Sequence, residues 1–168
     1  MTIHVGERLP EGTLQESTDF DPATGCPLKP QNLSVTAAAQ GKKLVLFGVP
    51  GAFTPTCSAQ HLPGYLAHLA ELKAKGVDEV WCLAVNDAFV MAAWGRDRQA
   101  TGKIRLLADG SAAYVKKLGL ELDLSDKGMG VRSQRFAMIV EDGVVTHLAV
   151  EAPGKFEVSS AEAILTQL

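Results

Sequence analysis

The sequence has few cysteines and no excess of positive charge. Its 168 residues include three cysteines, Cys26, Cys57 and Cys82, which are too few and too widely spaced for a disulfide framework or a four-ligand metal site. The formal net charge of -3 supplies no basic surface for gripping nucleic acid. The small number of cysteines favours a reducing compartment, and the lack of excess positive charge argues against a polyanion partner.

Long apolar runs are also missing. The longest nearly apolar run extends from Leu44 to Phe53, which is far below the roughly 20 residues of a membrane-spanning helix. The first residues lack the basic stretch and apolar run of a secretory signal and are too acidic for a transit peptide. We therefore expect a cytoplasmic protein that does not cross a bilayer. A hydrophobic content of 46% over this length suits one compact domain across residues 1–168.

The apolar residues alternate between strand-like and helix-like spacing. A continuous apolar run at 43–49, ended by Pro50-Gly51, predicts a strand buried on both faces of a parallel sheet. Helical spacing predicts a helix from about Thr56 to Lys75, bent by Pro63-Gly64. The alternation then continues, with strands predicted at 79–85 and 104–107 and helices predicted at 88–98 and 111–118.

The two ends of the chain carry different signals. Asp142-Gly143 between apolar runs at 135–141 and 144–150 predicts an antiparallel hairpin. Ser159 and Glu162 have the spacing of a capping box that opens a last helix to Leu168. The polar, turn-rich segment 13–40 predicts an N-terminal hairpin and loop. Together these elements predict an α/β protein with a mixed central sheet flanked by helices, the thioredoxin arrangement.

Cys57 occupies the most informative position in the chain. It lies in V-P-G-A-F-T-P-T-C-S, between a predicted buried strand and the first turn of a helix. The unpaired N–H groups and positive dipole of that turn stabilise an ionised thiol, so we expect a thiolate near neutral pH. Thr54 replaces the first cysteine of a C-x-x-C pair, and its hydroxyl can accept a proton from an incoming hydroperoxide. Pro50 has no N–H and can shield the site from water.

The pattern P-x-x-x-T-x-x-C, formed by Pro50, Thr54 and Cys57, resembles the peroxidatic motif of peroxiredoxins. The longer V-P-G-A-F-T-P-T-C-S-x-x-H-L-P-G-Y resembles the peroxiredoxin 5 subfamily, also called type II. The likeness continues through A-V-N-D-A-F-V-M-A-A-W, G-M-G-V-R-S-Q-R-F and E-V-S-S-A-E-A-I-L. The resemblance implies a thioredoxin-like, thiol-dependent peroxidase. Such an enzyme reduces hydrogen peroxide and organic hydroperoxides in antioxidant defence and redox homeostasis, without a metal or other cofactor.

The resemblance also implies roles for individual residues. Cys57 matches the peroxidatic nucleophile, which becomes a sulfenic acid as water or an alcohol leaves. The active-site arginine of the family matches Arg135 in S-Q-R-F, with Arg132 as a rival three residues earlier. Pro50, Thr54 and Arg135 are then the substrate-binding residues as well as parts of the catalytic site.

Two routes for regenerating the thiolate stay open. In some relatives a resolving cysteine lies where this chain has Val158, whereas Cys82 matches the second cysteine of plant-like type II members. Cys82 is therefore either a resolving thiol or a buried small hydrophobe. The other route is reduction by glutathione, glutaredoxin or thioredoxin. Cys26 lies in a loop, where we expect it to be exposed and outside catalysis.

Other interpretations accompany these hypotheses. His61, four residues after Cys57, is a candidate catalytic base, half of a metal site, or a packing and hydrogen-bonding residue. The segment 88–94 is apolar almost all round, which indicates either a deeply buried helix or a homodimer interface, as relatives of the subfamily suggest. A thiol:disulfide carrier is the alternative enzyme, disfavoured by the missing C-x-x-C. A redox sensor or holdase is the alternative without turnover.

Overall fold

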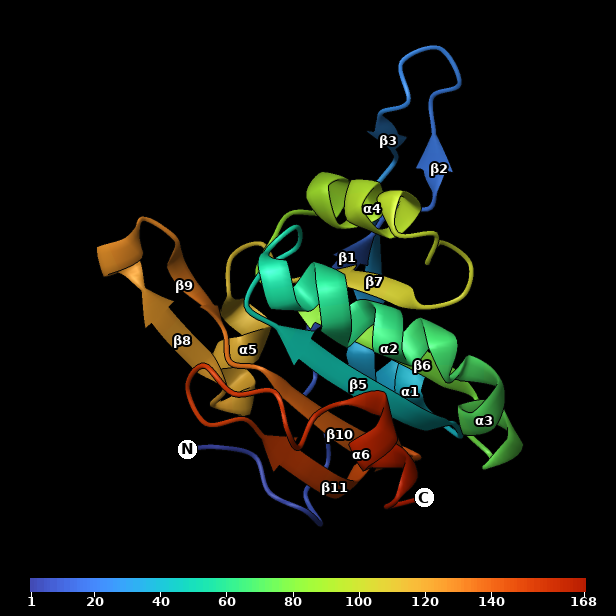
Figure 1. Cartoon of the computed structure of the whole chain (residues 1–168), viewed down its shortest axis with the longest axis vertical. Helices are drawn as coiled ribbons and strands as arrows, with labels where there is room; N and C mark the ends of the chain where they lie inside the picture. Colours follow the sequence, from blue (N-terminus) through green and yellow to red (C-terminus); the bar gives the residue numbers. More distant parts are fainter.

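A computed structural model describes residues 1–168 and is organised around a seven-stranded mixed sheet (Figure 1). Its strands are β1 (Thr13–Glu16), β4 (Gln31–Ser34), β5 (Lys43–Val49), β6 (Glu79–Ala84), β7 (Arg105–Ala108), β10 (Phe136–Glu141) and β11 (Val144–Val150). They lie in the order β11-β10-β5-β6-β7-β1-β4. The three central strands β5, β6 and β7 are parallel, and β10 pairs with β5 in the antiparallel direction. The predicted mixed sheet is confirmed.

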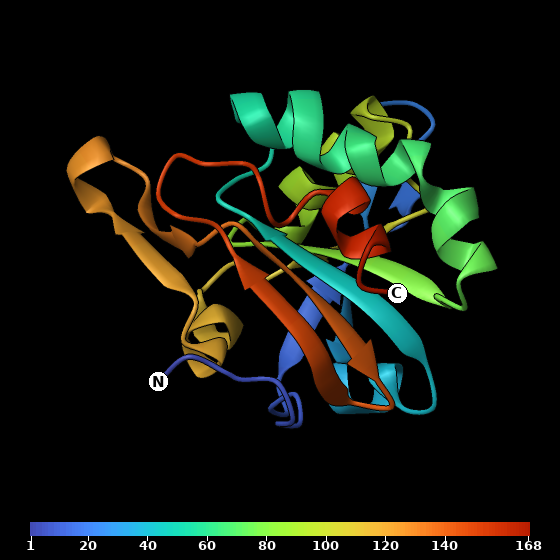
Figure 2. The same ribbon diagram turned by 60° about the horizontal axis from the view of Figure 1, so that its bottom comes forward.

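Helices cover both faces of this sheet (Figure 2). They are α1 (Val35–Ala39), α2 (Leu62–Ala67), α3 (Leu69–Ala74), α4 (Ala88–Asp97), α5 (Ala113–Leu118) and α6 (Ala161–Leu165), with a π-helical turn η1 (Cys57–His61) and a 3-10 turn η2 (Ser125–Lys127). One buried apolar cluster joins η1, α2, α3, α4 and α6 to one face of the sheet. A second cluster joins α1 and α5 to the opposite face. This is the predicted thioredoxin-like arrangement.

The central strand β5 is buried on both faces, as its continuous apolar run predicts. Leu44 and Leu46 enter the cluster under α1 and α5, whereas Val45, Phe47 and Val49 enter the cluster under α2 and α4. The alternation follows from the two-residue period of a strand. Because both faces are covered, the carboxyl end of β5 is held firmly where the loop to Cys57 begins.

A close approach between two strands fixes the register at this point. Gly48 of β5 pairs with Phe136 of β10. A Cβ atom added at Gly48 would collide with the buried Phe136 ring, so only glycine fits here without a shift of the ring. The register places Arg135, the residue before β10, beside the end of β5.

The long helix predicted after Cys57 is divided differently from the prediction. The sequence predicts a bend at Pro63-Gly64, but the interruption between α2 and α3 lies at His68, whose backbone leaves helical geometry. Pro63 lies in the first turn of α2, which follows directly on η1. Before it, the N–H of Leu62 reaches back to the carbonyl of Cys57, which makes the π-helical turn η1.

The last helix also differs from the prediction. Ser160, rather than Ser159, caps α6, because the Ser160 hydroxyl accepts a hydrogen bond from the N–H of Ala163. The Ser159 hydroxyl instead donates to the carboxylate of Glu151. The α-helix ends at Leu165 and does not continue to Leu168. The capping pattern in the sequence therefore points to Ser159, but the side chain of Ser159 binds Glu151 in the folded chain and does not cap the helix.

Several shorter elements complete the fold. The predicted N-terminal hairpin is present, with β1 and β4 paired at one edge of the sheet and a small hairpin of β2 (Asp19–Phe20) and β3 (Pro27–Leu28) projecting beyond them (Figure 1). The hairpin of β8 (Glu121–Leu124) and β9 (Gly130–Ser133) is not predicted from the sequence. The structure contains no helix with the length and apolarity needed to cross a membrane.

Candidate active site

Cys57 is the first residue of η1 and lies just beyond the carboxyl end of β5. Hydrogen bonds from backbone N–H groups fix the connecting loop. The N–H of Ala52 donates to Oδ1 of Asn86 at 2.9 Å, and the N–H of Ser58 donates to the carbonyl of Thr54 at 3.0 Å. Cys57 is fully buried. The loop therefore holds one cysteine at the edge where sites form in sheets with parallel strands.

Arg135 contacts the sulfur of Cys57. Its Nη2 lies 3.1 Å from Cys57 Sγ, although the two residues are separated by 78 positions in the sequence. The pairing of β10 with β5 produces this contact, because it sets the start of β10 beside the end of β5. A guanidinium carries a permanent positive charge and several donors, so it suits an anionic sulfur and oxygen atoms that gain negative charge.

The rival arginine, Arg132, lies in strand β9 and makes different contacts. Its Nη1 donates to the carbonyl of Pro50 at 3.3 Å, and its Nε donates to the carbonyl of Met129 at 2.9 Å. Arg132 thus contacts the backbone of the loop, whereas Arg135 contacts the sulfur itself. Of the two candidates, Arg135 has the geometry expected of a group that acts on Cys57.

Thr54 and Pro50 flank the same loop and are both partly exposed. The Thr54 hydroxyl donates to the carbonyl of Gly51 at 2.7 Å. Because its proton is engaged there, its lone pairs are free to accept a hydrogen bond from an incoming O–H group. Arg135 contacts Cys57, and Pro50 and Arg135 line one cavity, while Thr54 lies between Pro50 and Cys57 in the chain.

His61 is a buried hydrogen-bonding residue. Its Nδ1 lies 2.9 Å from Nη1 of Arg135, and its Nε2 lies 3.0 Å from the carbonyl oxygen of Ser159. Burial, followed by the positive charge of Arg135, lowers the pKa of His61 to about 3. The ring is therefore neutral at physiological pH, with Nδ1 accepting from Arg135 and Nε2–H donating to Ser159. Of the three predicted roles, the structure shows the hydrogen-bonding one.

Glu151 holds the segment that meets His61. Its carboxylate accepts hydrogen bonds from the N–H groups of Glu157, Val158 and Ser159 at 2.8 to 2.9 Å and from the Ser159 hydroxyl at 2.7 Å. Burial alone would raise the pKa of Glu151, but hydrogen bonds led by those of Ser159 outweigh it and lower the pKa. The carboxylate is thus ionised and fully engaged.

The other two cysteines lie in contrasting surroundings. Cys82 is fully buried in β6, opposite Phe47 of β5, and belongs to the same apolar cluster as Cys57. Burial, with a smaller effect of Cys57, raises the pKa of the Cys82 thiol well above its usual range. Cys26 is exposed in the projecting β2–β3 hairpin, as predicted.

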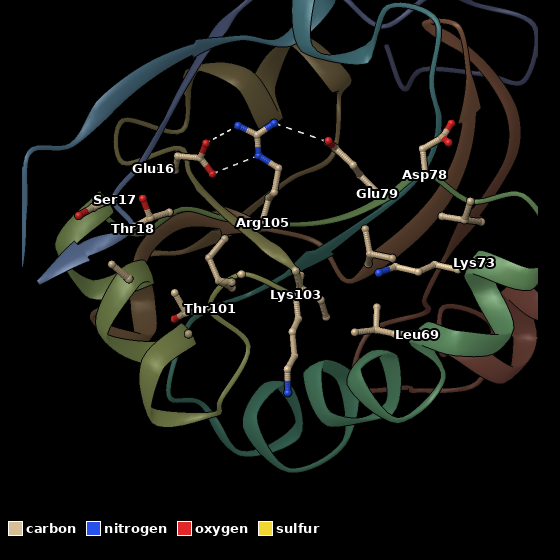
Figure 3. A pocket seen from close by; sticks show the side chains of 17 residues that line it. Glu16, Ser17, Thr18, Leu69, Lys73, Asp78, Glu79, Thr101, Lys103 and Arg105 are labelled. Atoms are coloured by element: carbon tan, nitrogen blue, oxygen red, sulfur yellow. Dashed lines mark hydrogen bonds and ion pairs between the residues drawn. The ribbon is translucent and has the colours of Figure 1, made fainter.

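Two cavities lie at different ends of the sheet. One of about 290 Å³ is lined by α3, the start of β6 and the start of β7, and Figure 3 shows Arg105 at its wall, held between Glu16 and Glu79. It contains none of the motif residues, so it is not the candidate active site. Another of about 500 Å³ lies beside Arg135 and Pro50, and its wall also includes Lys155 and Phe156.

Sequence reasoning missed how His61, Ser159 and Glu151 are connected. The sequence offers a weak signal for His61, which follows Cys57 by four residues and so lies near it on a helix. It offers none for Glu151, because the contact with Ser159 joins two loop positions that local patterns treat as unrelated. No group of three or more histidine, cysteine or acidic side chains is arranged to share a metal ion.

The fold and the position of Cys57 place the chain in the thioredoxin-like class of proteins, and comparisons with known proteins narrow this class. Residues 4–165 match the Redoxin family. Peroxiredoxin-2B of Arabidopsis thaliana is 51% identical over 166 residues, which are 99% of this chain and 98% of the relative.

Two solved structures are similar over nearly their whole length. Reduced Prx3 of Vibrio vulnificus in complex with hydrogen peroxide has a TM-score of 0.89 and 50% identity, with 99% of each chain covered. A Burkholderia cenocepacia protein with the provisional description of a thioredoxin reductase has a TM-score of 0.94 and 57% identity, covering 100% of this chain and 99% of that one. The description of the second differs from the peroxiredoxin names of the other relatives.

This chain belongs to the Redoxin family and is a peroxiredoxin of the type II, peroxiredoxin 5-like kind. It is therefore a thiol-dependent peroxidase, an oxidoreductase that acts on peroxide and has an antioxidant function. The predicted fold, family and enzyme class are confirmed.

Proposed function

We propose that Cys57 is the nucleophile that reduces the hydroperoxide. Its anionic sulfur attacks the terminal oxygen of ROOH, so that an S–O bond forms while the O–O bond breaks. The electron pair of the O–O bond leaves with RO⁻, which takes up a proton and departs as ROH, and Cys57 becomes a sulfenic acid. The observation that carries this proposal is the 3.1 Å contact between Arg135 Nη2 and Cys57 Sγ at the first residue of η1.

Arg135, Thr54 and Pro50 would hold the peroxide against this sulfur. The guanidinium stabilises the charge that moves onto the leaving oxygen, and the Thr54 hydroxyl accepts a hydrogen bond from the terminal O–H of the peroxide. Pro50 adds no competing donor beside them. The hydrogen peroxide bound by the Vibrio vulnificus relative supports this choice of substrate.

We propose that a thiol from outside the chain regenerates Cys57. Glutathione, glutaredoxin or thioredoxin would attack the sulfenic sulfur, release water and form a mixed disulfide, and a second thiol would then restore the Cys57 thiol. The burial of Cys82 supports this route, because its raised pKa leaves little thiolate to act as the attacking group. An internal disulfide would need the chain around Cys57 or Cys82 to open first.

Mass spectrometry after treatment with one equivalent of hydrogen peroxide tests both proposals. Without glutathione, we expect one added oxygen on the peptide that contains Cys57. With glutathione, we expect a mixed disulfide on Cys57 in the wild type and equally in Cys82→Ser. A protein that consumes no peroxide would contradict the nucleophile. A Cys57–Cys82 disulfide, together with loss of turnover in Cys82→Ser, would contradict the external route.

We also propose that two copies associate through the surface around the start of α4. Phe53 and Phe89 are 53% and 52% exposed, and the hydrogen bond from Ala52 to Asn86 joins the loop that carries Phe53 to the segment just before α4, which carries Phe89. Large exposed apolar side chains beside a site commonly mark an interface. In sedimentation velocity, Phe89→Glu is expected to shift the protein from dimer to monomer. The matched control is Val5→Glu, at a residue that is 58% exposed in the N-terminal segment; equal sedimentation of the two variants would contradict the interface.

A further inference from the structure

We propose that Glu151 is a positioning residue for Arg135, acting through Ser159 and His61. This inference rests on the proposed role of Cys57 as the nucleophile. It adds a remote carboxylate, with no contact to the sulfur, that determines where the guanidinium points.

The hydrogen bonds form a closed ring that begins and ends at Arg135. The N–H of Glu151 donates to the backbone carbonyl of Arg135 at 2.9 Å. The Glu151 carboxylate binds the N–H and hydroxyl of Ser159, and the Ser159 carbonyl accepts from Nε2 of His61 at 3.0 Å. Nδ1 of His61 then accepts from Nη1 of Arg135 at 2.9 Å. Both parts of Arg135 are thus connected to Glu151: its backbone carbonyl through the Glu151 N–H, and its guanidinium through the Glu151 carboxylate, Ser159 and His61.

The neutral imidazole of His61 has one donor nitrogen and one acceptor nitrogen, and this determines which group can bind on each side. Because Nε2 donates to a carbonyl, Nδ1 is left as the acceptor, and only a donor such as the guanidinium can face it. The imidazole of His61 packs against Phe47, Tyr65 and Phe156 with centroid separations of 4.8, 5.6 and 5.1 Å. It therefore has little freedom to turn, and its acceptor stays fixed relative to Arg135.

Glu151 determines where the Ser159 carbonyl lies. Three successive N–H groups, those of residues 157, 158 and 159, converge on its carboxylate, so the segment before α6 is wrapped around one charged group. Without that charge the three donors lose their common acceptor, and the carbonyl that holds His61 is no longer fixed. Ser159 is fully buried, and a buried donor without a partner is destabilising, which favours rearrangement of the segment.

Arg135 uses its two terminal nitrogens for different purposes. Nη1 is held by His61 and Nη2 contacts Cys57 Sγ. Because a guanidinium is planar and rigid, fixing one nitrogen fixes the other. Through these hydrogen bonds, the position of Glu151 determines where Nη2 of Arg135 points relative to the sulfur and the peroxide.

The test compares two reactions of Cys57 in the same variants. In Glu151→Ala, we expect the rate of oxidation by hydrogen peroxide to fall about tenfold to a hundredfold, the loss that a displaced group produces. Alkylation by iodoacetamide is expected to fall much less, since it needs the sulfur but not a guanidinium aligned on a leaving oxygen. Circular dichroism and urea unfolding establish that the variants compared are folded.

Glu162→Ala is the matched control. The Glu162 carboxylate lies in α6 and bonds His68 at 3.0 Å, with no hydrogen bond to Arg135, His61 or Ser159, so its loss should leave the ratio of the two rates near that of the wild type. His61→Leu and His61→Gln form a second pair that does not depend on Glu151. Leucine removes the acceptor for Nη1 and should lower the ratio, whereas the amide oxygen of glutamine offers an acceptor and should restore part of it.

The outcomes separate this inference from the proposed function. If the wild type itself shows no oxidation of Cys57 by peroxide, the proposed function fails. If the wild type reacts and folded Glu151→Ala reacts at the same rate, the positioning role of Glu151 is wrong. If Glu151→Ala does not fold, the two His61 variants decide. Equal rate ratios in the wild type, His61→Leu and His61→Gln would overturn the proposal, because Glu151 is connected to the guanidinium of Arg135 through the imidazole of His61.

Discussion

Replacement of Arg135 by glutamine is expected to lower kcat/KM for hydrogen peroxide by about 10²- to 10³-fold, the loss typical of removing one preorganised donor from a reaction centre. The physical reason is the 3.1 Å contact of Nη2 with Cys57 Sγ. Glutamine keeps a polar side chain but loses the permanent charge and the second donor. Stopped-flow measurement of the first oxidation checks this directly. Trp94 is a suitable fluorescent reporter, because its Nε1 donates to the hydroxyl of Ser58, the neighbour of Cys57.

Arg132→Gln is the matched comparison for this experiment. Arg132 binds the carbonyls of Pro50 and Met129, so its loss loosens the loop without removing a charge from the sulfur. We expect a clearly smaller effect than in Arg135→Gln. Arg135→Lys should not restore the rate, since one ammonium group cannot contact both Cys57 and His61 as a planar guanidinium does. The assignment is wrong if Arg132→Gln abolishes turnover while Arg135→Gln retains it.

The overall fold could be predicted because apolar periodicity records which faces of each element are buried. The run at 43–49 predicts a strand covered on both faces, and β5 is such a strand. The position of the helix interruption could not be predicted in this way. The ring of His68 hydrogen-bonds Glu71 at 2.8 Å and Glu162 at 3.0 Å, and Glu162 belongs to α6, 94 residues away. Long-range contacts of this kind leave no periodic signal.

The β8–β9 hairpin was missed for a related reason. Its strands are half exposed and four residues long, and a five-residue connection, part of it the 3-10 turn η2, replaces the two-residue turn that marks a hairpin in a sequence. The hairpin of β10 and β11, by contrast, has the Asp142-Gly143 signal and was predicted. Short elements with polar faces therefore need the tertiary structure to identify them.

In the candidate site, too, residues of one local motif could be predicted from the sequence, whereas residues joined by long-range contacts could not. Cys57, Thr54 and Pro50 form one local motif, so the sequence alone places them together. Arg135 joins them only through strand pairing, and its selection over Arg132 comes from the family resemblance and then from the contact with the sulfur. The contact between Glu151 and Ser159 could not be predicted from the sequence. The spacing of Ser159 and Glu162 favours a capping box, whereas in the folded chain the Ser159 hydroxyl donates to the Glu151 carboxylate.

The other large effect expected at this site concerns Thr54. Thr54→Val replaces the hydroxyl by a methyl group of nearly the same size, and we expect oxidation of Cys57 by hydrogen peroxide to slow by about 10²-fold, as when a reacting group is misplaced. The Thr54 proton is engaged by the carbonyl of Gly51 at 2.7 Å. The oxygen therefore presents lone pairs, and valine removes the only part of this side chain that can accept the O–H of the peroxide.

Thr54→Ser separates this role from packing. Serine keeps the hydroxyl and its bond to Gly51 while it loses the methyl group, whereas valine keeps the bulk and loses the hydroxyl. If hydrogen bonding matters, Thr54→Ser retains most of the rate and Thr54→Val does not. If the side chain only fills space, the order of the two variants is reversed. The same stopped-flow measurement, repeated with iodoacetamide in place of peroxide, should show little difference between the variants, because alkylation presents no O–H for Thr54 to accept.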